Sequence, residues 1–228
     1  MSIRVSLYDF FAYTLPGIFY LGIIGFWLNT VGLLVVDFAS IKDALGAITF
    51  LIVGAGYILG LLIDDPLAYK WISFFQGRNS KAAKVAFDEF TQRHPWVNLN
   101  YEYKDWGILL RAVKSVSLEV GADVEQHNVA FIMLRNISLA FVFCSISAVI
   151  YYFVVLSNLW ILALGIMFLV LAIVAMRRGR IRRHWFYTAV FEAFTAHFLL
   201  DPKTGSVKTA EKSNTSTSKS IKKATDEK

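Results

Sequence analysis

The sequence predicts an all-α membrane protein with four transmembrane helices in two hairpins. Of its 228 residues, 56% are hydrophobic and the mean hydropathy is +0.52, whereas soluble domains contain roughly 45 to 50% apolar residues. The apolar residues form long blocks, and blocks of about 18 or more indicate helices that cross a bilayer. Charged residues gather between the second and third blocks, which predicts a small helical cytoplasmic domain there.

The first hairpin is predicted within residues 1–63. An aromatic-rich amphipathic N-terminal helix leads to Pro16, which suits the first turn of a helix because the missing backbone donor costs little there. The first span then runs to about Val36. After a short polar connection, a second apolar block continues to Asp64 and Asp65, where the second span ends.

Residues 64–128 are predicted to form a cytoplasmic helical segment. They contain eight Lys or Arg and nine Asp or Glu residues, too many charges for a membrane span. Apolar residues nevertheless recur at helical spacing, as in amphipathic helices. The last of these helices starts near Tyr103, has a weak point at Gly121, and continues into the third span.

The second hairpin is predicted within residues 129–176, with a tight exit turn at Ser157 and Asn158. Residues 177–200 follow as a basic juxtamembrane amphipathic helix. From residue 201 to residue 228 the chain is rich in Lys, Ser and Thr and has no apolar pattern, which is typical of a disordered tail.

The distribution of Lys and Arg predicts the orientation. The two hairpin connections hold one Lys between them, while the middle segment and the region after residue 176 hold many. Because cytoplasmic flanks are enriched in basic residues, both termini are expected in the cytoplasm. The basic run is expected to form a lipid-facing cluster on anionic headgroups, made of Arg177, Arg178, Arg180, Arg182 and Arg183.

A glycine string in the second span predicts close helix packing. Gly54, Gly56 and Gly60 lie within one apolar block, and the last two form a G-x-x-x-G pair that lets helix backbones approach. The pattern fits packing within one chain or between subunits. We expect a homo-oligomer.

Four residues at the cytoplasmic ends of spans are candidate polar or sensor positions. Asp64 and Asp65 could bind a cation, or simply start the next helix before the following proline. His127 and Arg135 lie near the start of the third span, where a charged residue suggests function. The alternative is that Arg135 extends to the interface and marks the span's beginning.

Nothing in the sequence indicates an enzyme. No catalytic or phosphate-binding motif is found, no cofactor is expected, and the single Cys144 and four histidines show no metal-ligand spacing. A basic patch without readout residues does not indicate nucleic acid as a partner.

Two alternative functions stay open. Arg178 and His184 resemble the R-x4-6-H signature of the HEPN ribonucleases, with Gly179 in place of the usual polar residue. That resemblance implies RNA cleavage by a membrane-tethered nuclease. A small channel or transporter would instead use polar residues within the spans, namely Asn29, Thr30, Ser145 and Ser147.

The opening of the chain resembles uncharacterised small bacterial multi-span proteins with a D-F-F-x-Y-x-x-P-G motif, some of which lie near anti-phage defence genes. The residues concerned are Y-D-F-F-A-Y-T-L-P-G at 8–17, together with G-Y-I-L-G at 56–60. The resemblance implies a non-enzymatic membrane component of a stress or anti-phage system. Such a component would oligomerise and act on the membrane through or with a cytoplasmic protein partner.

Overall fold

A computed structural model describes residues 7–33, 45–76, 79–97 and 101–198. All regular structure in these residues is helical, and four helices are long and apolar enough to cross a membrane, which confirms the predicted multi-pass fold. The polar connection after the first span and the C-terminal tail lie outside the described residues. The elements are α1 (Leu7–Thr30), α3 (Leu45–Ile63), the π-helical turn η2 (Asp64–Ala68), α4 (Tyr69–Gln76), α5 (Asn79–Arg93), the 3-10 turn η3 (Tyr103–Asp105), α6 (Trp106–Val116), α7 (Leu118–Val154) and α8 (Leu159–Phe198).

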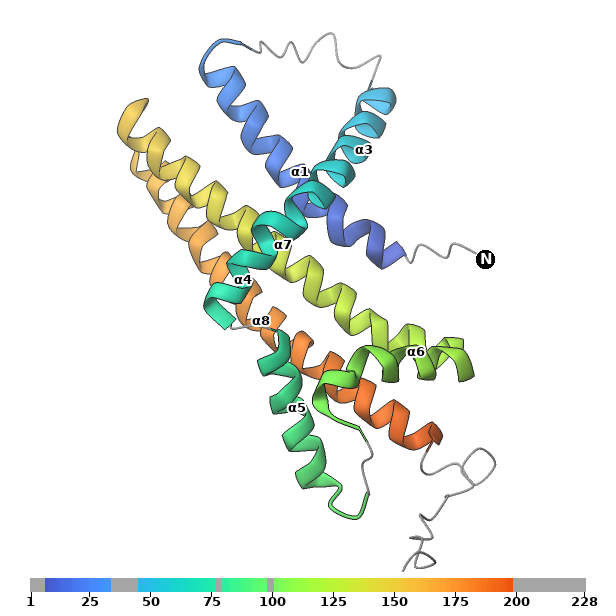
Figure 1. Cartoon of the computed structure of the whole chain (residues 1–228). Helices are drawn as coiled ribbons and strands as arrows, with labels where there is room; N and C mark the ends of the chain where they lie inside the picture. The colour runs from blue at the N-terminus through green and yellow to red at the C-terminus, as the bar shows by residue number, and fades with distance from the viewer. Residues whose placement is uncertain (1–6, 34–44, 77–78, 98–100, 199–228) are drawn as a thin grey trace, which may run out of the picture.

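The first hairpin is held by a close crossing of α1 and α3, which spread apart on one side of it (Figure 1). A Cβ atom at Gly17 would lie 1.7 Å from the carbonyl oxygen of Gly56, and one at Gly60 would lie 2.1 Å from that of Tyr13. The two backbones therefore touch. Gly54, the third glycine of the predicted packing face, has open space where a Cβ would stand.

The start of the first span differs from the expectation. Pro16 is inside α1, nine residues after Leu7, so the aromatic entry and the span are one helix rather than two. Membrane helices tolerate an internal proline because neighbouring groups can satisfy the carbonyl that loses its donor. Pro16 is fully buried beside the crossing point at Gly17, so here the ring is part of the packing.

The second hairpin consists of α7 and α8, which run antiparallel along their whole length (Figure 1). Asn158 lies in the turn between them, and its side-chain oxygen accepts a hydrogen bond from the Trp160 amide at 3.0 Å. The Ser138 hydroxyl donates to the Ala172 carbonyl at 3.1 Å. With 37 and 40 residues, the helices are about 55 and 60 Å long, twice the roughly 30 Å hydrocarbon thickness.

Both helices are therefore longer than the hydrocarbon is thick and continue past it without a break. The sequence predicted this continuity through residue 128, and the amphipathic helix expected after residue 176 belongs to the same helix as the span, so neither boundary is a break. The chain instead breaks at Ser117, whose backbone is extended and whose side chain accepts from the Val120 amide at 3.3 Å. Gly121, the predicted weak point, is helical and packs against Lys114 of α6. Serine is a favoured N-cap residue, which explains why α7 starts directly after Ser117. Gly121 lies inside α7, where the absence of a side chain lets Lys114 approach closely.

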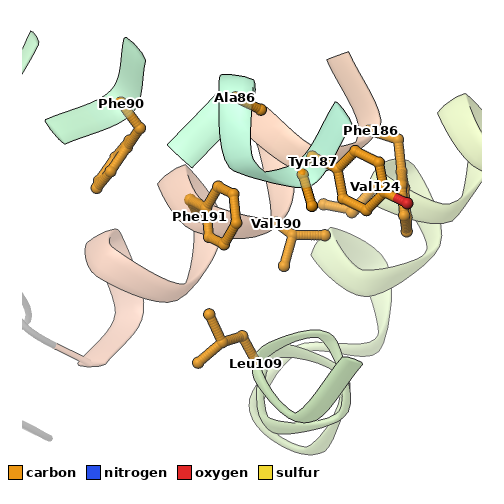
Figure 2. Close-up of a cluster of buried hydrophobic side chains, with 9 residues drawn as sticks. Ala86, Phe90, Leu109, Val124, Phe186, Tyr187, Val190 and Phe191 are labelled. Atoms are coloured by element: carbon orange, nitrogen blue, oxygen red, sulfur yellow. The ribbon is translucent and has the colours of Figure 1, made fainter. Parts of the chain in front are cut away.

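Outside the membrane part, α5, α6 and α7 pack on the C-terminal half of α8 around an aromatic core (Figure 2). Its fully buried members include Phe90, Val190 and Phe191. Tyr101 covers this core, stacks on Phe191 with 6.3 Å between ring centroids, and hydrogen-bonds Thr195 at 3.1 Å. Burial raises the pKa of the Tyr101 phenol, so this ring stays neutral.

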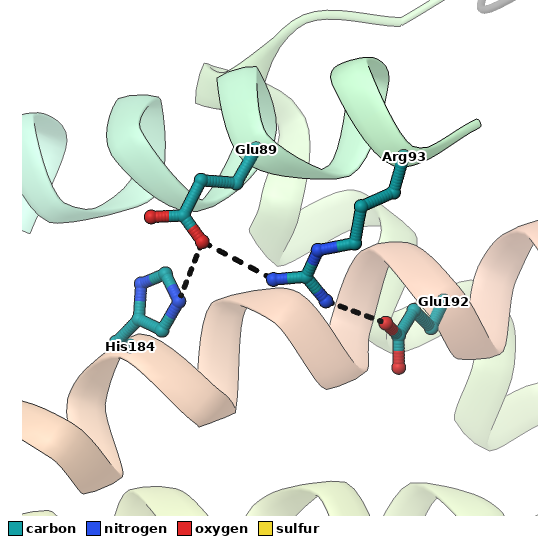
Figure 3. Close-up of polar contacts among 4 residues, drawn as sticks. All are labelled: Glu89, Arg93, His184 and Glu192. Atoms are coloured by element: carbon teal, nitrogen blue, oxygen red, sulfur yellow. Dashed lines mark hydrogen bonds and ion pairs between the residues drawn. The ribbon is translucent and has the colours of Figure 1, made fainter. Parts of the chain in front are cut away.

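A chain of charges also joins α5 to α8 (Figure 3). Glu89 contacts His184 at 3.2 Å and Arg93 at 3.1 Å, and Arg93 in turn lies 3.7 Å from Glu192. Three of these side chains are about half exposed and that of His184 is 29% exposed. Exposed ion pairs contribute little free energy, so the aromatic core supplies most of the stability and the charges mainly align the two helices.

We expect Gly60→Ala to destabilise the first hairpin strongly, because the added methyl group meets backbone rather than a flexible side chain. Gly54→Ala is the matched control, in the same helix but with open space around it. Thermal unfolding of the purified proteins in detergent should show a clear drop for Gly60→Ala alone. Equal stability of the two variants would contradict the crossing geometry.

Candidate functional site

A buried ion pair joins the two hairpins where α3 ends. The Asp64 carboxylate accepts a hydrogen bond from the Arg135 guanidinium of α7. The side chains are only 13% and 7% exposed. In the sequence these two residues are separate candidates, and the structure brings them together across 71 positions of the chain.

The backbone around Asp64 is a widened helical turn. Pro66 cannot donate a hydrogen bond, and the Tyr69 amide bonds to the Asp64 carbonyl five residues back, the spacing of a π-helix. Asp64 and Pro66 therefore continue the helix into α4, whereas the sequence suggested that the acids cap a new helix. π-Turns inside helices are frequent at functional sites. The Asp65 side chain lies outside the described part of the structure.

Aromatic rings complete the surroundings of Arg135. Its guanidinium carbon lies 5.9 Å from the centroid of the Tyr69 ring and 5.6 Å from that of Phe131. Arg183 of α8 lies over the same Phe131 ring, also at 5.6 Å. Cation–π contacts of this kind strengthen when water is excluded. Phe131 thus contacts two buried guanidinium groups at once.

A polar contact to α1 lies one residue beyond this cluster. The Tyr20 hydroxyl donates to the backbone carbonyl of Asn136 at 3.2 Å, and both residues are buried. Among the described residues, neither the side-chain nitrogen nor the oxygen of Asn136 has a hydrogen-bond partner. A buried side-chain amide without hydrogen-bond partners costs free energy. Asn136 therefore distinguishes this junction from an interface made of apolar side chains alone.

The ion pair lies near one edge of the hydrocarbon layer. Arg135 precedes the end of α7 at Val154 by about 28 Å along the helix axis, close to the roughly 30 Å thickness of the layer. At this depth a charge without a partner is expensive. We define Asp64, Tyr69, Phe131, Arg135 and Asn136 as the junction cluster.

The fourth candidate, His127, belongs to a different group. Its Nδ1 atom lies 3.4 Å from Arg182 Nη1, and its ring packs edge-on against Trp185 at 5.9 Å. The Arg182 guanidinium covers the same indole at 5.1 Å. His127 and Arg135 therefore do not act on one ligand, because each is engaged by a different partner.

The five arginines predicted as one lipid-facing cluster point in several directions, since they lie on one continuous helix. Arg183 is 3% exposed and faces Phe131 rather than lipid, and Arg182 is engaged by His127. The remaining three, Arg177, Arg178 and Arg180, are exposed. The periodicity of a helix accounts for this, because neighbouring positions turn by about 100°.

The residues of the nuclease interpretation are separated on α8. Arg178 and His184 lie six residues apart on an unbroken helix, about 9 Å along the axis and on different faces. His184 contacts Glu89 of α5. This arrangement does not favour joint action on one phosphodiester.

The residues of the transport interpretation do not line a shared polar path. The Trp27 indole donates to Ser147 at 3.2 Å, and the Thr30 hydroxyl bonds its own helix at Phe26. Ser145 is buried and Asn29 is exposed. A cavity of about 410 Å³ between α1, α7 and α8 includes Ser147, but its walls are almost wholly apolar.

Sequence reasoning missed the aromatic residues and the asparagine of the junction cluster. Asn136 carries a signal that could have found it, because an amide directly after Arg135 inside an apolar block is unusual. Tyr69 and Phe131 carry none, since aromatic residues are common throughout this chain.

We expect Asp64→Leu and Arg135→Met each to cost about 3 to 5 kcal/mol of unfolding free energy, because each leaves one buried charge unpaired. The double variant should recover much of this loss, since no charge then remains. Denaturant titration of the purified proteins in mixed micelles measures all three. Additive losses in the double variant would contradict a direct interaction between the two side chains.

The junction cluster joins the end of α3 to α7 through one buried ion pair and the aromatic rings around it. In the described residues, no group of three His, Cys, Asp or Glu side chains is placed to hold a metal ion. Comparison with family models, curated proteins and solved structures found no match to this chain. The role of the junction cluster therefore rests on the contacts among its own residues.

Proposed function

We propose that the protein is a non-enzymatic, multi-pass membrane component that transmits the binding of a cytoplasmic protein partner to its membrane hairpins. The observation that carries this proposal is the continuity of α7 and α8 from the spans into the aromatic core. A force or rotation applied to α5 or α6 reaches the membrane through helices without an intervening hinge.

Such a movement would act on the junction cluster, where α7 contacts the first hairpin. Arg135 is part of α7, and its partner Asp64 is part of the first hairpin. A rotation of α7 would therefore separate a buried charge pair, an event with a large energetic consequence. The first hairpin would be released from the second, and the membrane around them would be disturbed.

The proposed setting is a bacterial stress or anti-phage system. Its support is the resemblance of residues 8–17 and 56–60 to small membrane proteins near defence genes. Such a component would assemble into homo-oligomers in the inner membrane. The exposed apolar side of α3, which includes Phe50, Leu51 and Leu62, is available for packing against a second copy.

We further propose that both termini and the aromatic core are cytoplasmic, because basic residues concentrate on that side of the spans. In a Cys144→Ser background, Ser157→Cys should react with a membrane-impermeant maleimide in intact spheroplasts. Lys84→Cys, exposed on α5, should react only after the membrane is disrupted. The reverse pattern would contradict this orientation.

The role in defence is tested with cells that carry the gene and its native neighbours or lack the gene alone. We expect fewer plaques and a loss of membrane potential during infection only when the gene is present. Plaque counts and a potential-sensitive dye measure the two effects. Identical results with and without the gene would exclude the defence role.

The coupling is tested by inserting Gly-Gly-Ser-Gly between Arg178 and Gly179, where α8 passes from the membrane part to the core. The same insertion between Ser157 and Asn158, in the turn outside both helices, is the matched control. We expect the first insertion to abolish protection while membrane insertion is retained, and the second to preserve it. Protection by both would show that continuity of α8 is not required.

A further inference from the structure

A groove of about 510 Å³ lies between the start of α5 and α8, apart from the junction cluster. Lys81 contributes from α5, and Arg180 and His184 contribute from α8. Arg183 also lines the groove, where it is held buried over the Phe131 ring. Basic side chains from two different helices thus converge on one concave surface.

The acid in the groove is already engaged. Glu89 contacts both Arg93 and His184, so its charge is paired with basic side chains of the protein. Lys81 and Arg180 are exposed, and neither forms an ion pair with any residue that the structure describes. The groove is therefore positive overall and suits an anion, because ammonium and guanidinium groups are the preferred partners of phosphate oxygens.

The depth of the groove matches the phospholipid headgroups. The apolar block of α8 ends at Met176, and Arg180 follows about 6 Å further along the axis. The headgroup region extends about 5 to 8 Å beyond the hydrocarbon on each side. Val85, Ile181 and Trp185 on the groove walls are about half exposed, and tryptophan favours this interfacial depth.

We propose that this groove binds the phosphodiester of an anionic phospholipid. Lys81 and Arg180 contact the phosphate oxygens, Arg183 provides a fixed positive charge behind them, and the three apolar side chains contact the glycerol and upper acyl chain. A zwitterionic lipid binds less well, because its ammonium group finds no unengaged carboxylate in the groove. The inference rests on the membrane location and does not depend on the proposed coupling role.

The test is native mass spectrometry of the full-length protein in detergent, titrated with phosphatidylglycerol or with phosphatidylcholine. We expect one phosphatidylglycerol to bind about tenfold more tightly than phosphatidylcholine, and Lys81→Gln/Arg180→Gln to lose about tenfold of that affinity. The matched control is Lys84→Gln/Arg111→Gln. It removes two positive charges from exposed positions of α5 and α6 outside the groove.

Three results would overturn the proposal. Equal affinity for the two lipids would exclude recognition of an anionic headgroup. An equal loss in the control variant would show that overall charge, and not the groove, attracts the lipid. In lipid-depleted protein, stabilisation by inorganic phosphate that the groove variant loses, without a preference for phosphatidylglycerol, would assign the groove to a soluble phosphate. Thermal unfolding checks that all variants are folded.

Discussion

The pairing of Asp64 with Arg135 determines how the two hairpins are related. Each hairpin has internal contacts of its own, which are the glycine crossing in the first and the Ser138 bond in the second. Apolar surfaces alone give little orientation within lipid, because lipid chains are equally apolar. A buried charge pair with one favourable geometry supplies the missing specificity. The Tyr20 bond to α7 then fixes the position of α1 as well.

The fold could largely be predicted from the sequence, because apolar blocks of sufficient length have few structural alternatives in a membrane. The four spans and the turn at Ser157 and Asn158 follow directly from such blocks. The residues at which the helices begin and end could be predicted less well. A charged residue such as Arg177 marks the edge of the hydrocarbon, but it does not end a helix. The amino-acid composition changes at that point, whereas the backbone of α8 stays helical.

The candidate site could be predicted only in part. Asp64 and Arg135 stood out because charges beside apolar blocks are rare, but their partnership depends on a crossing of helices that lie far apart in the chain. The assignment of arginines to lipid failed for Arg183, since burial on α8 depends on where α5 and α7 pack against it. Tertiary neighbours, rather than local spacing, decide such cases.

The π-turn between Asp64 and Ala68 has a consequence for how the gene can vary. A turn of this kind arises when one extra residue enters an α-helix, and the bond to the carbonyl five residues back accommodates that residue locally. The bond from the Tyr69 amide to the Asp64 carbonyl thus holds Tyr69 beside Arg135 across this turn. A substitution at the exposed Leu67 can be tolerated, whereas one at Asp64 leaves Arg135 without its partner. A deletion of one residue between Asp64 and Tyr69 would leave the Tyr69 amide four residues after Asp64, the spacing of an ordinary α-helical bond, so this turn could lose one codon and α4 would still follow α3 in the same direction.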